Sequence, residues 1–507
     1  MRRRGANFIT MRSRPRSPFA TLAAIATLAL TIPSAARAQA PSFHDSRPQT
    51  LVIRNAHVVR GDGAPASGPQ DVWIEDGRIV RGPIDRPAAE IDGTGHYVLP
   101  GLVATHAHLH ERMADLPIPM QYQLDLWLAC GITTIRDVGS TLTRSLKMRS
   151  DSAKGALAAP RIFIYQQLGP IDDPDAGRAR VRQIAAGGAD GIKMWSNYSY
   201  RPDVVQAVMQ EAERAGLPVT AHIGVGESDA VTYATAGLSS IEHWYGIPDA
   251  AISGVQSFPP QFSYSNEVDR FRWAGRLWRE ADPERLDGVL AYLVERGVAW
   301  SPTLAVYEAS RDLMRAQNKP WFADCLHPAL ERFFVPSLDS HGSYFIGWSS
   351  TDEAYWKENY RIWMQALRRF ADLGGTVTTG EDAGYIYLLY GFGLVRELEL
   401  HHEAGFHPLE VIRHATYNGA KVLGKETEFG RVLPGLAADL IVVRGNPLQN
   451  LKCLYPTGCD VYVDGESVPT GGVQFTIKDG WVYHGPTLFQ RAKDLVARER
   501  KRVGSDR

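Results

Sequence analysis

Five short segments of this chain, each rich in β-forming residues, end in a side chain that can bind a metal ion. They span residues 103–108, 191–193, 219–222, 241–243 and 379–382, and supply His106, His108, Lys193, His222, His243 and Asp382. In a parallel barrel the carboxyl ends of the strands meet on one face, where such barrels carry out their chemistry. The pattern therefore predicts a barrel with one metal site, as in metal-dependent hydrolases.

The region between residues 96 and 380 predicts a (β/α)8 TIM barrel of the α/β class. Its eight candidate strands begin near His96, Gly131, Arg161, Gly191, Pro218, Ser239, Val298 and Thr376. Helical stretches such as 202–215 and 284–296 separate most of them, as parallel strands require. Two long insertions, 246–283 and 305–375, are rich in aromatic residues and arginine. These insertions either form helices that pack against the barrel or form a lid or substrate wall above the metal site, and we expect a mixture of both.

Both ends of the mature chain predict β-structure outside the barrel. Residues 51–98 contain short strands with a hairpin turn at Asp76-Gly77, and a second β-rich region covers 438–483. The simplest arrangement joins 39–98 and 430–485 in one small β-sandwich, into which the barrel, residues 99–429, is inserted. Residues 486–507 carry apolar side chains at helical spacing and predict a C-terminal helix with a charged tail.

The first 38 residues have the pattern of a secretory signal peptide. Six arginines precede an apolar run at 19–32, and Ala36-Arg37-Ala38 offers the cleavage site. The apolar run is short for a transmembrane anchor. We therefore expect a secreted or periplasmic protein, cleaved near Ala38 and left without a membrane anchor. Met11 also begins a complete signal, so a start at Met1 or at Met11 stays open.

The net charge and the cysteine content limit which binding partners and which cellular compartment are expected for the protein. Cleavage removes seven of the 55 Lys and Arg and none of the 56 Asp and Glu, leaving a formal charge of −8. No basic patch remains that would indicate nucleic acid binding. Cys453 and Cys459 flank a turn-forming Leu-Tyr-Pro-Thr-Gly stretch. In an oxidising compartment they predict a disulfide, with two free thiols as the alternative, and Cys130 is predicted to lie in the core.

The first two histidines and the lysine suit a site for two ions. His106 and His108 are two residues apart on a strand, so both imidazoles share a face and can chelate one ion. The ammonium of Lys193 has no lone pair for a metal, but a carbamate formed with carbon dioxide would be an anionic ligand able to bridge two ions. An isolated lysine at a strand end is more often solvated. The place of Lys193 at the fourth strand favours the ligand role.

The remaining ligand candidates end the fifth, sixth and eighth strands. His222 and His243, each of which could alone be an ordinary barrel histidine, would complete the shell of a second ion with the Lys193 carbamate. Asp382 can bind the first ion, accept a proton from the attacking water and deliver it to the leaving nitrogen. Glu381 next to it would point away in an extended segment.

These residues resemble the amidohydrolase superfamily, particularly its imidazolonepropionase-like and Xaa-Pro dipeptidase-like branch with a binuclear site. The motifs that carry the resemblance cover nearly all of the mature chain: Val98-Leu99-Pro100-Gly101-Leu102 with His106-x-His108, 188–193, His222, His243, 380–384, 415–421, 434–440 and 445–448. The resemblance implies two divalent ions, with zinc expected. His106, His108 and Asp382 would hold one ion, His222 and His243 the other, and carboxylated Lys193 and a hydroxide would bridge them.

The resemblance further implies hydrolysis of a C–N amide or peptide-like bond in a small molecule. The bridging hydroxide would attack a carbonyl polarised by one ion, with Asp382 as proton shuttle. Two departures leave the substrate open: Glu381 replaces a small hydroxyl residue, and Trp244-Tyr245 follow His243 where small residues are common.

Three residues near the ligands are candidates for other roles. His110 occupies the place where a relative carries an arginine for the substrate carboxylate, and Tyr245 could donate to an oxyanion. Arg136 is predicted to be structural, pairing with Asp137 or a neighbour.

Several functions fit this barrel. An amidohydrolase, acting for instance on a dipeptide or an N-acyl amino acid, is the leading hypothesis. The alternative is a cyclic-amide hydrolase or a mononuclear deaminase. Lys193 argues against the deaminase, and so does the absence of a glutamate three residues after His222. A metal-free binding protein is a third hypothesis, disfavoured because no ligand position has been lost. Assembly into a homo-oligomer stays open.

Overall fold

The computed structural model describes residues 41–505 except 196–199, 225, 255–257, 261, 264–265 and 339. The predicted signal peptide, residues 1–38, lies outside the described residues. Among the helices of the described part, none combines the length and apolar character needed to cross a membrane.

Seven parallel strands form the barrel sheet, in the order β14-β13-β12-β11-β10-β9-β6. They are β6 (Leu102–Ala107), β9 (Ile132–Asp137), β10 (Arg161–Gln167), β11 (Gly191–Met194), β12 (Val219–Ala221), β13 (Ser240–Glu242) and β14 (Ala299–Ser301). Every residue of β6, β9 and β11 is buried. Such burial on both faces is expected of parallel strands that helices cover. The α/β barrel predicted from the sequence is therefore confirmed.

The eighth strand position is filled by a segment that is not a regular strand. Trp300 and Val377 form a parallel bridge, and the Thr105 N–H donates to the Thr379 carbonyl at 2.8 Å, so this segment lies between β14 and β6. The chain then leaves the extended conformation, because Asp382 adopts a left-handed φ of 51°. The barrel is nearly closed, with its seam at the segment that carries Asp382.

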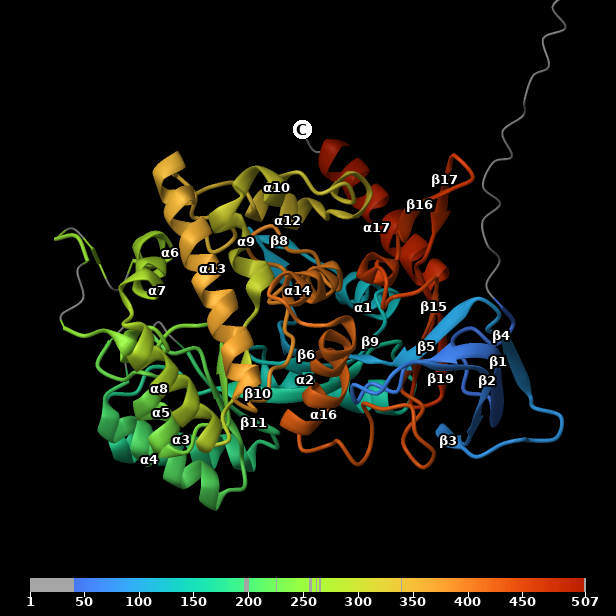
Figure 1. Cartoon of the computed structure of the whole chain (residues 1–507), viewed down its shortest axis with the longest axis horizontal. Coiled ribbons are helices and arrows are strands. Elements are labelled where there is room, and N and C mark those ends of the chain that lie inside the picture. The colour runs from blue at the N-terminus through green and yellow to red at the C-terminus, as the bar shows by residue number, and fades with distance from the viewer. Residues whose placement is uncertain are drawn as a thin grey trace, which may run out of the picture. The chain divides into compact units, whose positions relative to one another are not determined.

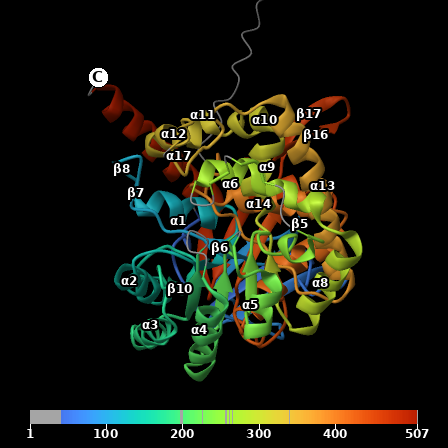
Figure 2. The same ribbon diagram turned by 90° about the vertical axis from the view of Figure 1, so that its left-hand side faces the viewer.

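Helices cover the outside of the barrel (Figures 1 and 2). They are α1 (Met120–Ala129), α2 (Leu142–Ala153), α3 (Pro174–Ala186), α4 (Pro202–Arg214), α5 (Ala230–Ala236), α8 (Pro283–Glu295), α14 (Phe392–Glu403), α15 (Pro408–Arg413), η3 (His414–Asn418) and α16 (Gly419–Val422). Helices α3 and α8 begin with a proline after a capping aspartate, Asp173 or Asp282. Both choices stabilise a helix start, since proline needs no N–H partner and the carboxylate accepts from free N–H groups.

The two insertions fold into additional helices. The first contains η1 (Asp249–Ala251), α6 (Glu267–Trp273), η2 (Ala274–Arg276) and α7 (Leu277–Glu280); the second contains α9 (Leu304–Arg311), α10 (Leu313–Gln317), α11 (Phe322–Cys325), α12 (Pro328–Phe333) and α13 (Ser350–Asp372). A short hairpin, β7 (Arg112–Met113) and β8 (Leu116–Pro117), follows the first barrel strand. Figure 2 shows α6, α9, α10 and α12 on the same side of the molecule, beyond the strands.

Both ends of the chain join, as predicted, and the strands of the expected small β-sandwich form one eight-stranded sheet. Its order is β19-β18-β15-β5-β1-β2-β3, with β4 paired to β1. The strands are β1 (Thr50–Val58), β2 (Ser67–Glu75), β3 (Arg78–Val80), β4 (Ala89–Asp92), β5 (His96–Pro100), β15 (Leu440–Arg444), β18 (Val473–Lys478) and β19 (Trp481–His484). A separate pair, β16 (Cys459–Val463) and β17 (Glu466–Thr470), follows η4 (Leu451–Leu454). The division into 39–98 with 430–485 and 99–429 remains our proposal for the domain boundaries.

The strand predicted to begin near His96 is divided between two modules, the terminal eight-stranded sheet and the barrel. Residues before Gly101 form β5, which pairs antiparallel with β15, whereas residues after it form β6 of the barrel. A Cβ at Gly101 would lie 2.1 Å from Thr133 Oγ1, so this crossing point has no room for a side chain. At the far end, α17 (Gly485–Ser505) forms as predicted, and its Arg491 donates to Asp125 of α1.

Candidate metal centre

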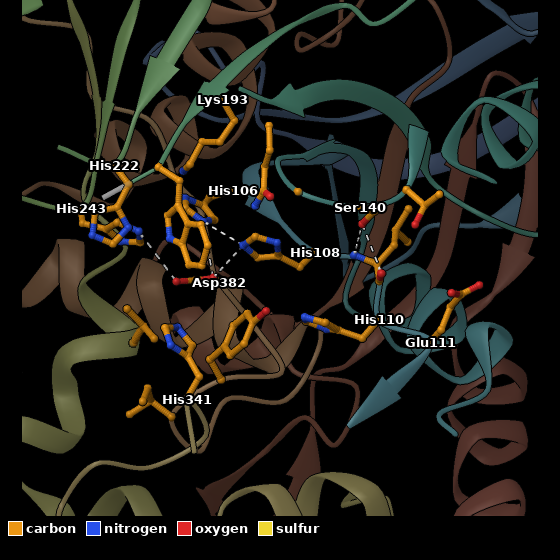
Figure 3. A pocket seen from close by; sticks show the side chains of 18 of the residues that line it. His106, His108, His110, Glu111, Ser140, Lys193, His222, His243, His341 and Asp382 are labelled. Carbon is orange, nitrogen blue, oxygen red and sulfur yellow. Dashed lines mark hydrogen bonds and ion pairs between the residues drawn. The ribbon is translucent and has the colours of Figure 1, made fainter. Parts of the chain in front are cut away.

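The six predicted ligand residues gather at the carboxyl end of the barrel (Figure 3). His106 lies in β6 and Lys193 in β11, while His222 and His243 directly follow β12 and β13. Asp382 lies at the seam, and its carboxylate is placed between the histidines (Figure 3). Ligand atoms of His106, His243 and Asp382 all lie within 4.8 Å of one another, a grouping that could hold a metal ion.

The distances suit the ligand set predicted for the first ion. The Asp382 Oδ1 atom lies 3.4 Å from His106 Nε2 and 3.2 Å from His108 Nε2. The two Nε2 atoms are 3.3 Å apart. On the other side, His243 Nε2 is 3.9 Å from Asp382 Oδ2. Both imidazoles of the His-x-His pair therefore point to the same carboxylate, as alternation along a strand requires.

The two remaining candidates carry buried polar atoms that lack a partner. The Lys193 Nζ and His222 Nε2 atoms have no hydrogen bond partner among the described residues. The His222 ring lies 4.2 Å from that of His243, and Lys193 is only 2% exposed. Burying an unpaired polar atom is costly, so such atoms call for an ion or another ligand. Their presence beside the other four residues fits a second ion.

Burial and neighbouring charges set the protonation of the site. Burial lowers the pKa of His222 and of His243 well below the usual value, so both rings are neutral at pH 7. Burial also lowers the pKa of Lys193 to about 8. Burial alone would raise the pKa of Asp382, but His106 and His108 hold it well below its usual range through charge and hydrogen bonds. Neutral imidazoles and an ionised carboxylate are the forms that bind metals.

Glu242 fixes the orientation of His106. Its Oε2 accepts from His106 Nδ1 at 2.6 Å, and its Oε1 accepts from Arg136 and from the Thr220 hydroxyl. The glutamate and the arginine are both fully buried. Because Nδ1 carries the proton, the Nε2 lone pair of His106 is directed into the site. Arg136 is structural, as predicted, and of the expected partners, Asp137 or a neighbour, it pairs with the neighbouring Glu242, while Asp137 accepts from Ser140 and Ser145.

His243 is held in a similar way by Thr303. Its Nδ1 lies 2.5 Å from Thr303 Oγ1, and that hydroxyl donates to the Pro302 carbonyl at 2.7 Å. The hydroxyl therefore accepts from Nδ1–H, which leaves His243 Nε2 facing Asp382. Both residues have left-handed φ angles, 63° and 50°, a strained conformation that often occurs at functional sites.

Glu381 points away from the ligands, as predicted. Its carboxyl group accepts from Trp127 Nε1 and from the N–H groups of Gly391 and Leu394, at 2.8 and 3.0 Å for the two backbone donors. Burial raises its pKa to about 8. Glu381 therefore ties the seam segment to the start of α14, which explains its departure from the small residue expected there.

A cavity of about 360 Å³ opens over the six residues, and both predicted substrate contacts line it. His110 Nδ1 lies 2.8 Å from the Tyr390 hydroxyl, while its buried Nε2 has no partner in the described part of the chain. The Tyr245 ring stacks on His222, with centroids 5.0 Å apart. The cavity is also lined by residues that the sequence patterns do not predict, including Arg270, Tyr307, His341 and Tyr385. These come from insertions and loops, where no periodic pattern marks the inward side.

The predicted disulfide is not formed in this structure. Cys453 and Cys459 are free thiols whose sulfur atoms lie 3.8 Å apart. Because the two cysteines are adjacent in space, the pairing stays a prediction for the oxidised protein. Cys130 is fully buried in the core, as expected.

Comparisons with known sequences agree with this architecture. The chain is 29% identical over 229 residues to an uncharacterized protein of Mycobacterium bovis, a match over 41% of this chain and 60% of that protein. The chain thus spans less than two thirds of the length of that relative. It is 24% identical over 422 residues to a 5-methylthioadenosine/S-adenosylhomocysteine deaminase of Symbiobacterium thermophilum, covering 78% of this chain and 85% of the deaminase.

Solved structures share the fold at low identity. A Xaa-Pro dipeptidase with bound methionine aligns with a TM-score of 0.60 and 21% identity, over 86% of this chain and all of that one. The bottromycin amidohydrolase aligns with a TM-score of 0.65 and 18% identity, over 89% and 92%. Most directly, the model of the amidohydrolase family matches residues 97–255 and 357–483, more than half of the sequence. The chain belongs to the amidohydrolase family.

Proposed function

We propose that this protein is a metal-dependent amidohydrolase that cleaves a C–N amide or peptide-like bond in a small molecule. The observation that carries the proposal is the convergence of six donor side chains beneath one cavity, two of them with buried nitrogen atoms that have no partner among the residues the structure describes. A structural role explains paired buried groups, but it does not explain orphaned ones.

The residues present fit two divalent ions. His106, His108 and Asp382 would hold one ion, His222 and His243 the other, and Lys193, carboxylated on Nζ, would bridge them. Nitrogen and carboxylate ligands of this kind suit zinc. Bound ions would supply a water acidic enough to attack at neutral pH and would polarise the amide carbonyl.

The side chains of the protein then position the substrate and move the proton. Asp382 is the base that takes a proton from the attacking water as the C–O bond forms, and the acid that returns it to nitrogen as the C–N bond breaks. His106, and to a smaller extent His108, hold the pKa of Asp382 well below its usual range, so that the carboxylate is ionised before the reaction. Tyr245 and His110, which both line the cavity, are the candidates to orient the substrate.

A deaminase or cyclic-amide hydrolase on the same barrel is the second candidate. The similarity to the Symbiobacterium deaminase over 78% of this chain favours it. Against the deaminase stand Lys193, which a mononuclear site does not need, and Val225, which occupies the position three residues after His222. Release of ammonia from adenosine-like substrates, measured beside amide hydrolysis, separates the two.

The test of the binuclear site compares two buried lysines. Elemental analysis of the wild-type protein should find two metal ions per chain, and Lys193→Ala should lose metal and activity, with partial rescue of activity by short carboxylic acids. Lys478 is the matched control, because it is only 1% exposed but its Nζ donates to the Ser152 carbonyl at 2.6 Å. Lys478→Ala should keep its metal content. Equal metal content in wild type and Lys193→Ala would remove the bridging lysine from the proposal.

Export is the other part of the proposal. The leader pattern in residues 1–38 supports a secreted or periplasmic location. N-terminal sequencing of the protein recovered from the periplasm or medium should begin near Gln39. Full-length protein found only in the cytoplasm would contradict it.

A further inference from the structure

The cavity over the metal centre adjoins a second and wider compartment. The inner one, of about 360 Å³, contains the ligand side chains, whereas the outer one has about 980 Å³. They share five lining residues: His110, Arg112, Trp195, His341 and Tyr385. A substrate whose amide bond lies at Asp382 can therefore extend one of its ends into the outer compartment.

Aromatic and apolar side chains form about half of the wall of the outer compartment, and the polar residues His110, Arg112, Ser263, Asn266 and His341 form the rest. Phe333 at the end of α12, together with Tyr344, Tyr385 and Trp195, provides ring surfaces, and Met113 adds an apolar side chain. The rings of Phe333 and Tyr385 have their centroids 6.1 Å apart, so the wall is continuous on that side. Leu338 at the rim is 64% exposed. Exposed apolar surface beside a ring-lined hollow is typical of a site that receives an apolar group.

The charges around both compartments are mostly positive. Among the described residues that line them, the carboxylates are Glu111 and Asp382. Glu111 forms a salt bridge with Arg144, and Asp382 faces the histidines of the metal centre. Arg112, Arg144 and Arg270 also line the space. Among the described lining residues an ammonium group would thus meet guanidinium groups and no carboxylate besides these two, and an unpaired charge in a cavity is unfavourable.

From these observations we infer that the substrate is an amide whose outer end is a bulky, ring-bearing and uncharged group. An N-aroyl or N-arylacyl amino acid has this form, whereas a free dipeptide carries an ammonium group at its outer end. This inference rests on the proposed amide hydrolysis and narrows its substrate class. It assigns the aromatic wall to the recognition of the acyl group.

A matched substrate panel tests the inference with the metal-loaded enzyme. Glycine, proline, methionine and phenylalanine would each carry one of four N-terminal groups: acetyl, 2-naphthoyl, 3-phenylpropanoyl or phenylalanyl. The last two differ only by the α-ammonium group. We expect kcat/KM to rise about 100-fold from acetyl to naphthoyl, because the ring buries extra apolar area. We expect at least about a 10-fold preference for phenylpropanoyl over phenylalanyl, from the missing counter-charge.

A pair of surface variants locates the effect. Leu338→Glu at the rim should reduce the naphthoyl-to-acetyl ratio of kcat/KM. Met314→Glu makes the same change at a residue of α10 that is 70% exposed and lines neither compartment, so it should leave the ratio unchanged. Both positions are exposed, and neither change should prevent folding.

The outcomes separate the inference from the proposed function. Hydrolysis of acetyl and naphthoyl substrates at equal rates, or of dipeptides in preference to phenylpropanoyl substrates, would overturn the inference and leave the amidohydrolase proposal standing. If no amide in the panel is cleaved, the proposed function fails for these amides. In that case, the binding of N-(2-naphthoyl)glycine, measured by calorimetry, tests whether the outer compartment receives the ring. Binding that Leu338→Glu weakens supports the aromatic wall, and absence of binding overturns it.

Discussion

Replacing Glu242 by glutamine should weaken both the barrel and its metal site. The carboxylate is fully buried and accepts from His106, Arg136 and Thr220. The amide keeps the shape but removes the charge, so the fully buried Arg136 loses its ion pair. Breaking a buried pair in this way costs about 3–5 kcal/mol of the free energy of unfolding.

The same replacement acts on the metal through His106. The glutamine amide cannot both accept from Nδ1–H and satisfy Arg136 with a single oxygen atom. The ring is then no longer fixed with its Nε2 lone pair toward Asp382, and loss of such a partner lowers metal affinity about 10–100-fold. The assays are chemical denaturation of the metal-free protein and a zinc competition titration.

Glu381 provides the matched control. It is also a fully buried glutamate, next to the site, but its pKa of about 8 makes it uncharged at pH 7. Glu381→Gln should therefore cost only about 1 kcal/mol, the loss of one hydrogen bond acceptor. Adding Arg136→Met to Glu242→Gln should restore part of the stability but not the zinc affinity. If both glutamine variants behave alike in stability and in zinc binding, the ion pair does not have the role described.

Other predictions concern the proton, the pH dependence and the thiols. Asp382→Asn should lower kcat by about 10²–10⁴-fold, the usual loss of a general acid–base, while circular dichroism shows an intact fold; unchanged kcat would exclude Asp382 as the shuttle. Burial lowers the pKa of His327 to about 4 from 6.5, and its Nδ1 accepts from the Ala329 N–H. As the pH falls, the His327 side chain is protonated in the unfolded chain before it is protonated in the folded protein. The contribution of neutral His327 to the free energy of unfolding is therefore complete above pH 6.5, and up to about 3 kcal/mol of it is lost as the pH falls to 4. His327→Asn keeps a capping acceptor and does not titrate, so denaturation midpoints should show the wild type losing stability relative to it below pH 6.5; parallel curves would contradict the shift. Thiol titration of exported, denatured and unreduced protein should count two free thiols, and four would exclude the Cys453–Cys459 bond.

The convergence of the candidate ligand residues was predictable because strand geometry is local. His106 lies near the end of β6 and His108 directly follows that strand, and the carboxyl ends of parallel strands share one edge. The gathering of His106, His108, His222 and His243 at one end of the barrel is therefore expected from their spacing. The barrel and the joining of both chain ends also follow from hydrophobic pattern and order. Lys193 needed the resemblance in addition, because a lysine at a strand end is usually solvated.

The remaining features depend on contacts between distant residues. Arg136 and Glu242 are 106 positions apart, and no local pattern distinguishes this partner from the adjacent Asp137. The eighth strand is reduced to a bridge at Val377, because the chain turns at Asp382 soon after it. The cavity walls include the short helix α12 and the irregular segment 385–390. Their inward side is set by tertiary packing and not by periodicity.

The passage of β5 into β6 at Gly101 makes the two modules inseparable. Pro100 pairs with Leu440 of the terminal sheet, and Leu102, two residues later, pairs with Ile132 of the barrel. A fragment of residues 99–429 would lack β15, the strand that pairs with the residues of β5 directly before the strand that carries His106. Such a fragment should fail to fold with a metal site. A chimaera that exchanges the barrels of two relatives at this junction would have to exchange the terminal sheet as well.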